Sequence, residues 1–154
     1  MQLRRTTKVM IGIITISTPL ALVVETFLRG LMFPPEFEEV RMYLRPALAL
    51  PTWSLLSLVL LTTYAGVRGM ERRIARRMAK RPPSEQTQRY RDKETFDAIV
   101  MFTSLPQVPA ILATFCFMVG APLTPVIANM VAATAAVMFL GLRGLKLGAQ
   151  SRAE

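Results

Sequence analysis

Residues 98–142 read AIVMFTSLPQVPAILATFCFMVGAPLTPVIANMVAATAAVMFLGL, a run of forty-five residues without one Asp, Glu, Lys or Arg. A helix that crosses a bilayer needs about 20 largely apolar residues, so this run is long enough to cross twice. A Gly-Ala-Pro sequence at 120–122 stands near its middle, where glycine and proline favour a turn. The run therefore predicts a transmembrane hairpin with spans over about residues 98–119 and 123–142.

Two further apolar stretches precede this hairpin, over about residues 9–33 and 46–67. We therefore expect an all-α, polytopic membrane protein with four transmembrane helices, in a single membrane domain over residues 1–154. A basic start followed by an apolar run is also typical of a cleaved signal peptide. The first run continues beyond the usual apolar core of a signal, and no clear small-x-small cleavage site follows it. These features favour an uncleaved anchor.

The composition excludes several classes of function. The chain has no histidine, and its one cysteine, Cys116, lies inside the third expected span. Zinc sites, most haem sites and histidine-based acid–base catalysis lose their usual ligand or base. We therefore expect no metal and no cofactor. The formal charge of +9 would suggest nucleic acid in a soluble protein. Here the basic residues flank the spans, which favours anionic lipid headgroups over a nucleic-acid partner.

The distribution of lysine and arginine predicts the orientation in the membrane. Sixteen of the nineteen lie before residue 9, between 68 and 93, or after 142. The other three lie between the first and second spans, beside three glutamates, and none lies between the third and fourth spans. Because cytoplasmic loops carry an excess of basic residues, both termini should face the cytoplasm. The short loops suit a bacterial plasma (inner) membrane.

Two polar segments predict short interfacial helices. Residues 34–45 open with two prolines and three acids, as the first turns of helices do, and then carry apolar residues at helical spacing. We interpret them as an outer amphipathic helix in which Glu38 pairs with Arg41, the alternative being a capped loop. Residues 68–97 form a cytoplasmic basic helix and linker. Within them Met70, Ile74 and Met78 recur every fourth residue, and a Pro-Pro pair then stops the helix.

The basic residues of this cytoplasmic helix are candidates for contact with lipid or a partner. An anionic bilayer attracts such residues by about 1 kcal/mol each near the surface. The candidates are Arg72, Arg73, Arg76, Arg77, Lys80 and Arg81.

Three residues are candidates for ion coupling. Glu25 is the only acid inside a span, and intramembrane carboxylates are expensive enough to suggest a proton or cation site. Arg29 stands one turn later, so a structural ion pair near the outer boundary is the competing explanation. Gln107 lies near the midplane of the third span, between Pro106 and Pro109. Each proline removes a hydrogen-bond donor from the helix and predicts a kink. The polar groups freed at the kink either line a polar pathway or are hydrogen-bonded inside the bundle.

The fourth span carries small residues at i, i+4 and i+8, which let helix backbones approach closely. We expect these residues, Ala128, Ala132 and Ala136, to pack against neighbouring helices. In an antiparallel hairpin Asn129 comes level with Thr114, which predicts a hydrogen bond from Asn129 toward the third span.

Three functions remain open, and no motif ties the chain to a known family. The first is a non-catalytic membrane component that acts through helix packing, lipid or partner contacts, as a homo-oligomer or within a larger membrane complex. The second is a small oligomeric transporter or channel that uses Glu25 and the kinked third span. A membrane enzyme is the least supported, because catalytic residues are scarce and the outer glutamates are explained by a helix N-terminus.

Overall fold

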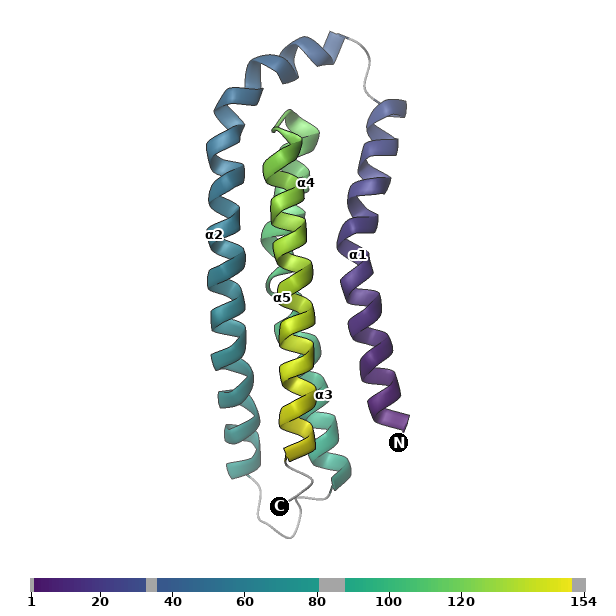
Figure 1. The fold of residues 1–154 in the computed structure, drawn as a ribbon, viewed down its shortest axis with the longest axis vertical. Helices are drawn as coiled ribbons and strands as arrows, with labels where there is room; N and C mark the ends of the chain where they lie inside the picture. The colour runs from purple at the N-terminus through teal and green to yellow at the C-terminus, as the bar shows by residue number, and fades with distance from the viewer. Residues whose placement is uncertain (1, 33–35, 81–87, 151–154) are drawn as a thin grey trace.

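The computed structural model of the chain describes residues 2–32, 36–80 and 88–150 (Figure 1). Within these ranges the structure is entirely helical, which confirms the expected all-α class. The helices are α1 (Gln2–Met32), α2 (Glu36–Ala79), α3 (Gln88–Ser104), α4 (Gln107–Val119) and α5 (Leu123–Gln150). Four segments are long and apolar enough to cross a membrane, as the sequence predicted. They are Val9–Leu28, Phe37–Ala79, Tyr90–Val119 and Leu123–Leu147.

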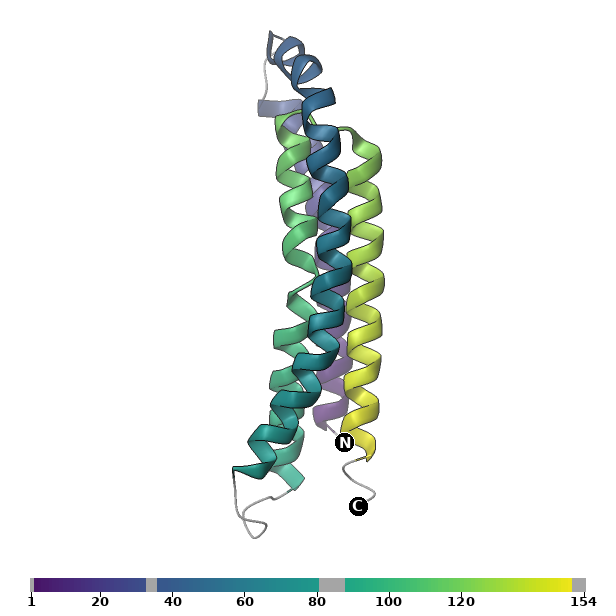
Figure 2. The same cartoon turned by 90° about the vertical axis from the view of Figure 1, so that its left-hand side faces the viewer.

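The helices form an elongated bundle around α5, which contacts each of the other four. Figure 1 shows α1 and α2 on opposite sides of α5, and Figure 2 shows α3 and α4 following each other end to end. The start of α1, the last turns of α2 and the end of α5 lie together at one end, which we call the basic end. The turn at 120–122 lies at the opposite end, which we call the turn end.

The third apolar segment is broken into two helices, where the sequence predicted one kinked helix. Helix α3 ends at Ser104 and α4 begins at Gln107, because two prolines follow in quick succession and neither has an N–H to donate. In a regular helix residue 109 would donate to the carbonyl of Leu105, but Pro109 has no N–H. The Leu105 carbonyl instead accepts a hydrogen bond from the Val108 N–H at 3.3 Å. The chain thus tightens by one residue at the break and supplies a local donor to this carbonyl.

Helix α2 contains three elements that were predicted from the sequence as separate segments. The outer amphipathic helix, the second span and the basic helix form one continuous helix from Glu36 to Ala79. Figure 1 shows its first turns running across the turn end before the helix bends down along the bundle. Pro46 and Pro51 lie inside α2, and each removes one backbone hydrogen bond, which lets a helix bend without ending. The predicted pair of Glu38 and Arg41 is confirmed, at 3.3 Å.

The interior of the bundle contains small and polar side chains among its apolar ones, and the outside also carries large apolar side chains. Thr52, Thr103 and Asn129 are fully buried, while Val23 and Phe27 of α1 are 64% and 69% exposed. Soluble proteins rarely expose apolar patches larger than a few hundred Å². A bundle that is apolar along its sides indicates association with a membrane, because lipid tails solvate such side chains and water does not.

The small residues of α5 lie in the packed interior, as predicted. Ala136 and Ala133 are buried in a cluster with Val59 of α2 and Ala110 of α4, and Ala132 packs against this cluster. Ala128 is half-buried. Without bulky side chains at these positions, the backbones of α2, α4 and α5 can approach one another closely.

Candidate functional site: a basic groove between two helices

The last turns of α2 place their apolar residues inward and their basic residues outward. Met70 is fully buried in a cluster with Ala98 and Ile99 of α3, and Ile74 packs against the same cluster. Because the helix repeats every 3.6 residues, an apolar residue at every fourth position leaves the other faces to the arginines. The orientation of this helix therefore follows from a spacing that the sequence already showed.

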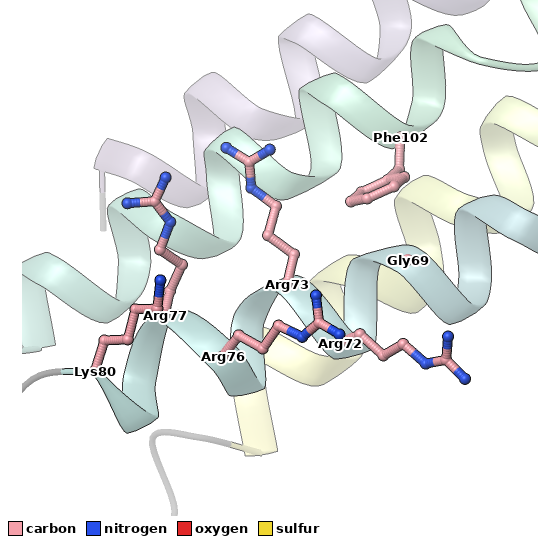
Figure 3. A pocket seen from close by; sticks show the side chains of 7 residues that line it. All are labelled: Gly69, Arg72, Arg73, Arg76, Arg77, Lys80 and Phe102. Atoms are coloured by element: carbon pink, nitrogen blue, oxygen red, sulfur yellow. The ribbon is translucent and has the colours of Figure 1, made fainter.

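A groove of about 500 Å³ opens between this part of α2 and helix α3 (Figure 3). Its cationic lining consists of Arg72, Arg73, Arg76, Arg77 and Lys80. Its remaining lining residues are Gly69 and Phe102. The Phe102 ring lies against Gly69 so closely that a methyl group at position 69 would overlap it. This contact brings α3 against α2 at the inner end of the groove.

Figure 3 shows how the basic side chains divide between the two sides of the groove. Arg73 and Arg77 point toward α3, whereas Arg72 and Arg76 extend along α2. The guanidinium of Arg73 contacts the sulfur of Met101, and Nε of Arg77 lies 4.0 Å from the carboxylate of Glu94. Both partners belong to α3, so these two arginines also tie α3 to α2.

The groove carries excess positive charge. In the part of the chain that the structure describes, Arg72, Arg76 and Lys80 form no ion pair or hydrogen bond. The neighbouring acid Glu71 is engaged elsewhere, because Arg143 of α5 donates to its Oε1 at 2.6 Å. None of the described residues that line this groove is acidic. Its chemistry therefore suits an anion, and above all one that accepts several charge-assisted hydrogen bonds.

The structure brings together five of the six basic residues that the sequence put forward for lipid or partner contact. The sixth, Arg81, lies outside the described residues. Sequence reasoning missed Gly69 and Phe102, which supply the apolar part of the groove. Neither residue gives a local signal, because their contact joins two helices and depends on how α3 packs against α2.

Two of the three candidates for ion coupling, Gln107 and Glu25, do not lie in one site. Its side-chain Nε2 donates to the backbone carbonyl of Ile14 in α1 at 2.7 Å. Glu25 is buried at 6% exposure, eleven residues further along α1, which corresponds to about 16 Å of helix. The Arg29 side chain lies outside the part of the structure that is described. Gln107 thus holds the broken third segment against α1, and Glu25 is a separate buried carboxylate.

Asn129 bonds to a different helix from the one predicted. Its Nδ2 donates to the carbonyl of Thr52 in α2 at 2.9 Å and to that of Pro125 in its own helix at 2.8 Å. The prediction that it reaches the third span was wrong, because this face of α5 packs against α2. Thr114 of α4 is buried, and its hydroxyl donates to the backbone carbonyl of Ala110 in the same helix.

A second cavity, of about 230 Å³, lies at the turn end around Arg41. Arg41 is only 4% exposed, and its Nη2 donates to the carbonyl of Phe117 in the last turn of α4 at 3.1 Å. A cation at a helix C-terminus satisfies exposed carbonyls and complements the helix dipole. Sequence reasoning gave Arg41 only Glu38 as a partner and missed this capping contact between α2 and α4.

Within the described ranges, no three or more His, Cys, Asp or Glu side chains gather where they could hold a metal ion. No protein-family model, curated protein or solved structure matches this chain. The functional argument therefore rests on the bundle and its basic groove.

Proposed function

We propose that this chain is a multi-pass integral membrane protein that acts as a non-catalytic component, through helix packing and through anionic contacts at its basic groove. The observation that carries the proposal is the concentration of five cationic side chains in one groove at the basic end of an otherwise apolar bundle. Such a bundle presents a charged contact surface only where it leaves the bilayer.

The positive-inside rule supports a cytoplasmic position for this groove. The basic end carries the lysines and arginines at the start of α1, in the last turns of α2 and in the last turns of α5. Cytoplasmic leaflets carry the anionic lipids that attract such segments. We therefore propose a plasma (inner) membrane location, in a bacterium, with both termini in the cytoplasm.

Packing with other membrane helices is the second part of the proposal. Helix α1 exposes most of its large apolar side chains and contacts α3, α4 and α5 along one side. An apolar face of this kind is compatible with lipid, with a second copy of the chain or with another membrane protein. We propose that the chain works as a homo-oligomer or within a larger membrane complex.

The test is co-purification from a mild detergent, with stoichiometry and bound species read by native mass spectrometry. Arg72, Arg73, Arg76 and Arg77 are replaced together by Gln. We expect the wild-type chain to retain anionic lipid or partners, and the fourfold variant to lose them. Arg45→Gln, at the turn end, is the control and should leave retention unchanged. Equal retention by the fourfold variant and the wild type would contradict the proposal.

A small oligomeric transporter or channel is the second candidate function, and the burial of Glu25 on an apolar helix supports it. Intramembrane carboxylates commonly serve as proton or cation sites. The test is ion flux in liposomes, measured with a pH-sensitive dye. Loss of flux in Glu25→Gln supports a coupling role, and unchanged flux in that variant removes it.

A further inference from the structure

We infer that the groove between α2 and α3 is a binding site for an anionic phospholipid. In this site the basic side chains of α2 hold the headgroup phosphate, and Phe102 contacts the first part of an acyl chain. The inference rests on the proposed membrane function and specifies which anion the groove takes.

The basic residues are arranged to surround a phosphate. Arg72, Arg76 and Lys80 stand four residues apart and form one row along α2, while Arg73 and Arg77 form a second row that faces α3. Residues at i and i+4 are neighbours on a helix surface, so each row offers adjacent donors. Arginine presents a planar fork of N–H groups that matches phosphate oxygens. Both rows lie on α2, one along the helix and one directed toward α3, so they can contact one phosphate from two directions.

The electrostatics of the groove require an anion. Like charges at i and i+4 destabilise a helix, and two such rows lie within three turns of α2. Glu94 compensates only Arg77, at 4.0 Å, and Glu71 is held by Arg143. A bound phosphate would relieve this repulsion, so its binding should also stabilise the folded chain.

The apolar end of the groove distinguishes a lipid from an acidic peptide. Gly69 and Phe102 lie just beyond the arginines, toward the middle of the bundle, and Phe102 projects from α3 toward Gly69. Position 69 lies two residues after the end of the second apolar stretch, next to Arg68, at the expected surface of the bilayer. Positive charge followed at once by an apolar surface matches a headgroup joined to an acyl chain. A soluble acidic peptide would leave that apolar end uncovered.

The experiment measures phospholipid binding to the full chain in a neutral detergent. Phosphatidylglycerol, phosphatidylcholine and inorganic phosphate are each titrated, with retention in native mass spectrometry and thermal stability as readouts. We expect phosphatidylglycerol to be retained and to raise the melting temperature, with little effect of the other two. Stabilisation by phosphatidylcholine to the same extent would overturn the proposal. An equal effect of inorganic phosphate would reduce the site to a simple anion site and would also overturn it.

The charge variant is Arg72→Gln with Arg76→Gln. Because both side chains are exposed and form no hydrogen bond or ion pair with the described residues, the variant should fold normally. We expect it to bind phosphatidylglycerol about thirtyfold more weakly, the factor that corresponds to two basic residues at a membrane surface. Arg5→Gln with Lys146→Gln removes two exposed charges from the same end but outside the groove, and should bind normally. Equal weakening in both double variants would show that only total charge matters and would overturn the site.

The outcome can be separated from that of the proposed function. If phosphatidylglycerol fails to bind while the fourfold arginine variant still loses a protein partner, the lipid site is wrong and the proposed function stands. If the purified chain is monodisperse in buffer without detergent, the membrane function itself fails, and the lipid site fails with it.

Discussion

Arg41 shows how a single side chain closes one end of this bundle. Its guanidinium is buried between α2 and the last turn of α4, where it pairs with Glu38 and donates to the Phe117 carbonyl. A buried charge is tolerated only when partners replace its water. Here one cation pairs with an acid and joins the Gly120 N–H as a second donor to the Phe117 carbonyl at the end of α4.

Gly120 is the residue that lets the chain turn beside Arg41. Its φ of 133° is accessible to glycine and rarely to other residues, and a Cβ here would lie 2.8 Å from the Arg41 carbonyl oxygen. We predict that Gly120→Ala destabilises the protein by about 1–3 kcal/mol, measured by thermal or denaturant unfolding in detergent. Gly12→Ala is the control, because nothing lies within 4 Å of a Cβ there. That variant should be as stable as the wild type or up to about 1 kcal/mol more stable. Equal stability of the two variants would contradict the prediction.

Asn129 joins α5 to α2 through a hydrogen bond in the interior. We predict that Asn129→Ala lowers the free energy of unfolding by about 0.6–1.7 kcal/mol, the range for side-chain hydrogen bonds between membrane helices. Steric-trap or denaturant unfolding in detergent measures this change. Thr114→Val is the matched control, because its hydroxyl bonds only within its own helix and its loss should cost less. A larger loss in the control would assign the stabilisation to α4 and not to the contact with Thr52.

At the level of elements, prolines act differently in the second and third apolar segments. Helix α2 contains Pro46 and Pro51 and continues through both, with a bend. The third segment breaks at Pro106, where Pro109 follows before a full turn can recover. A single missing donor bends a helix, whereas two within three residues leave too few backbone bonds to hold one turn. The break also places Gln107 at the start of α4, where it reaches the Ile14 carbonyl.

Helices α2 and α5 are linked at the basic end by the ion pair of Glu71 and Arg143. The side chains are 39% and 44% exposed, so solvent screens their attraction. A double-mutant cycle of Glu71→Gln and Arg143→Gln should give a coupling of about 0.2–1 kcal/mol at low salt. We expect this coupling to vanish near 1 M salt, where the Debye length falls to about 3 Å. The control cycle pairs Glu71→Gln with Lys146→Gln and should show no coupling. Coupling that persists in high salt would mean that the pair is shielded from solvent.

The whole molecule is apolar on its sides as well as in much of its interior, unlike a soluble domain. Large apolar side chains cover the sides of the bundle, a few polar side chains lie among the apolar ones inside, and cationic side chains gather at the basic end. In lipid there is no hydrophobic driving force between helices, so small residues, close packing and buried hydrogen bonds hold them together. The interior therefore contains alanines near Ala133 and the amide of Asn129 beside its large apolar side chains, and these let the helices approach and hydrogen-bond.

The orientation of the whole molecule is testable by labelling with a membrane-impermeant maleimide. Single cysteines are placed at Glu39, Lys80 and Lys146 in a Cys116→Ser background. We predict that Glu39→Cys reacts in intact cells, because few basic residues lie at that end. Lys80→Cys and Lys146→Cys should react only after permeabilisation. Reaction of Lys80→Cys in intact cells would place the basic groove outside the cell and contradict the proposed orientation.

The elements of the fold could be predicted because they depend on local sequence. Apolar runs of sufficient length predicted the four apolar segments, and the spacing of Met70, Ile74 and Met78 predicted which face of α2 turns inward. The ends of the helices were predicted less accurately. Polar stretches at 36–45 and 68–79 proved continuous with the second segment, since a helix bonds within itself and its backbone is indifferent to a change from polar to apolar side chains.

The sequence by itself determined that this chain is helical, that four of its segments suit a bilayer and that its positive charge gathers beside them. These properties depend only on which residues follow one another. Only the tertiary structure decided that Phe102 completes the basic groove, that Asn129 bonds to α2 and that Arg41 caps α4. Each of these contacts joins residues far apart in the chain, and in a bundle of several apolar helices the hydrophobic pattern alone cannot select which faces meet.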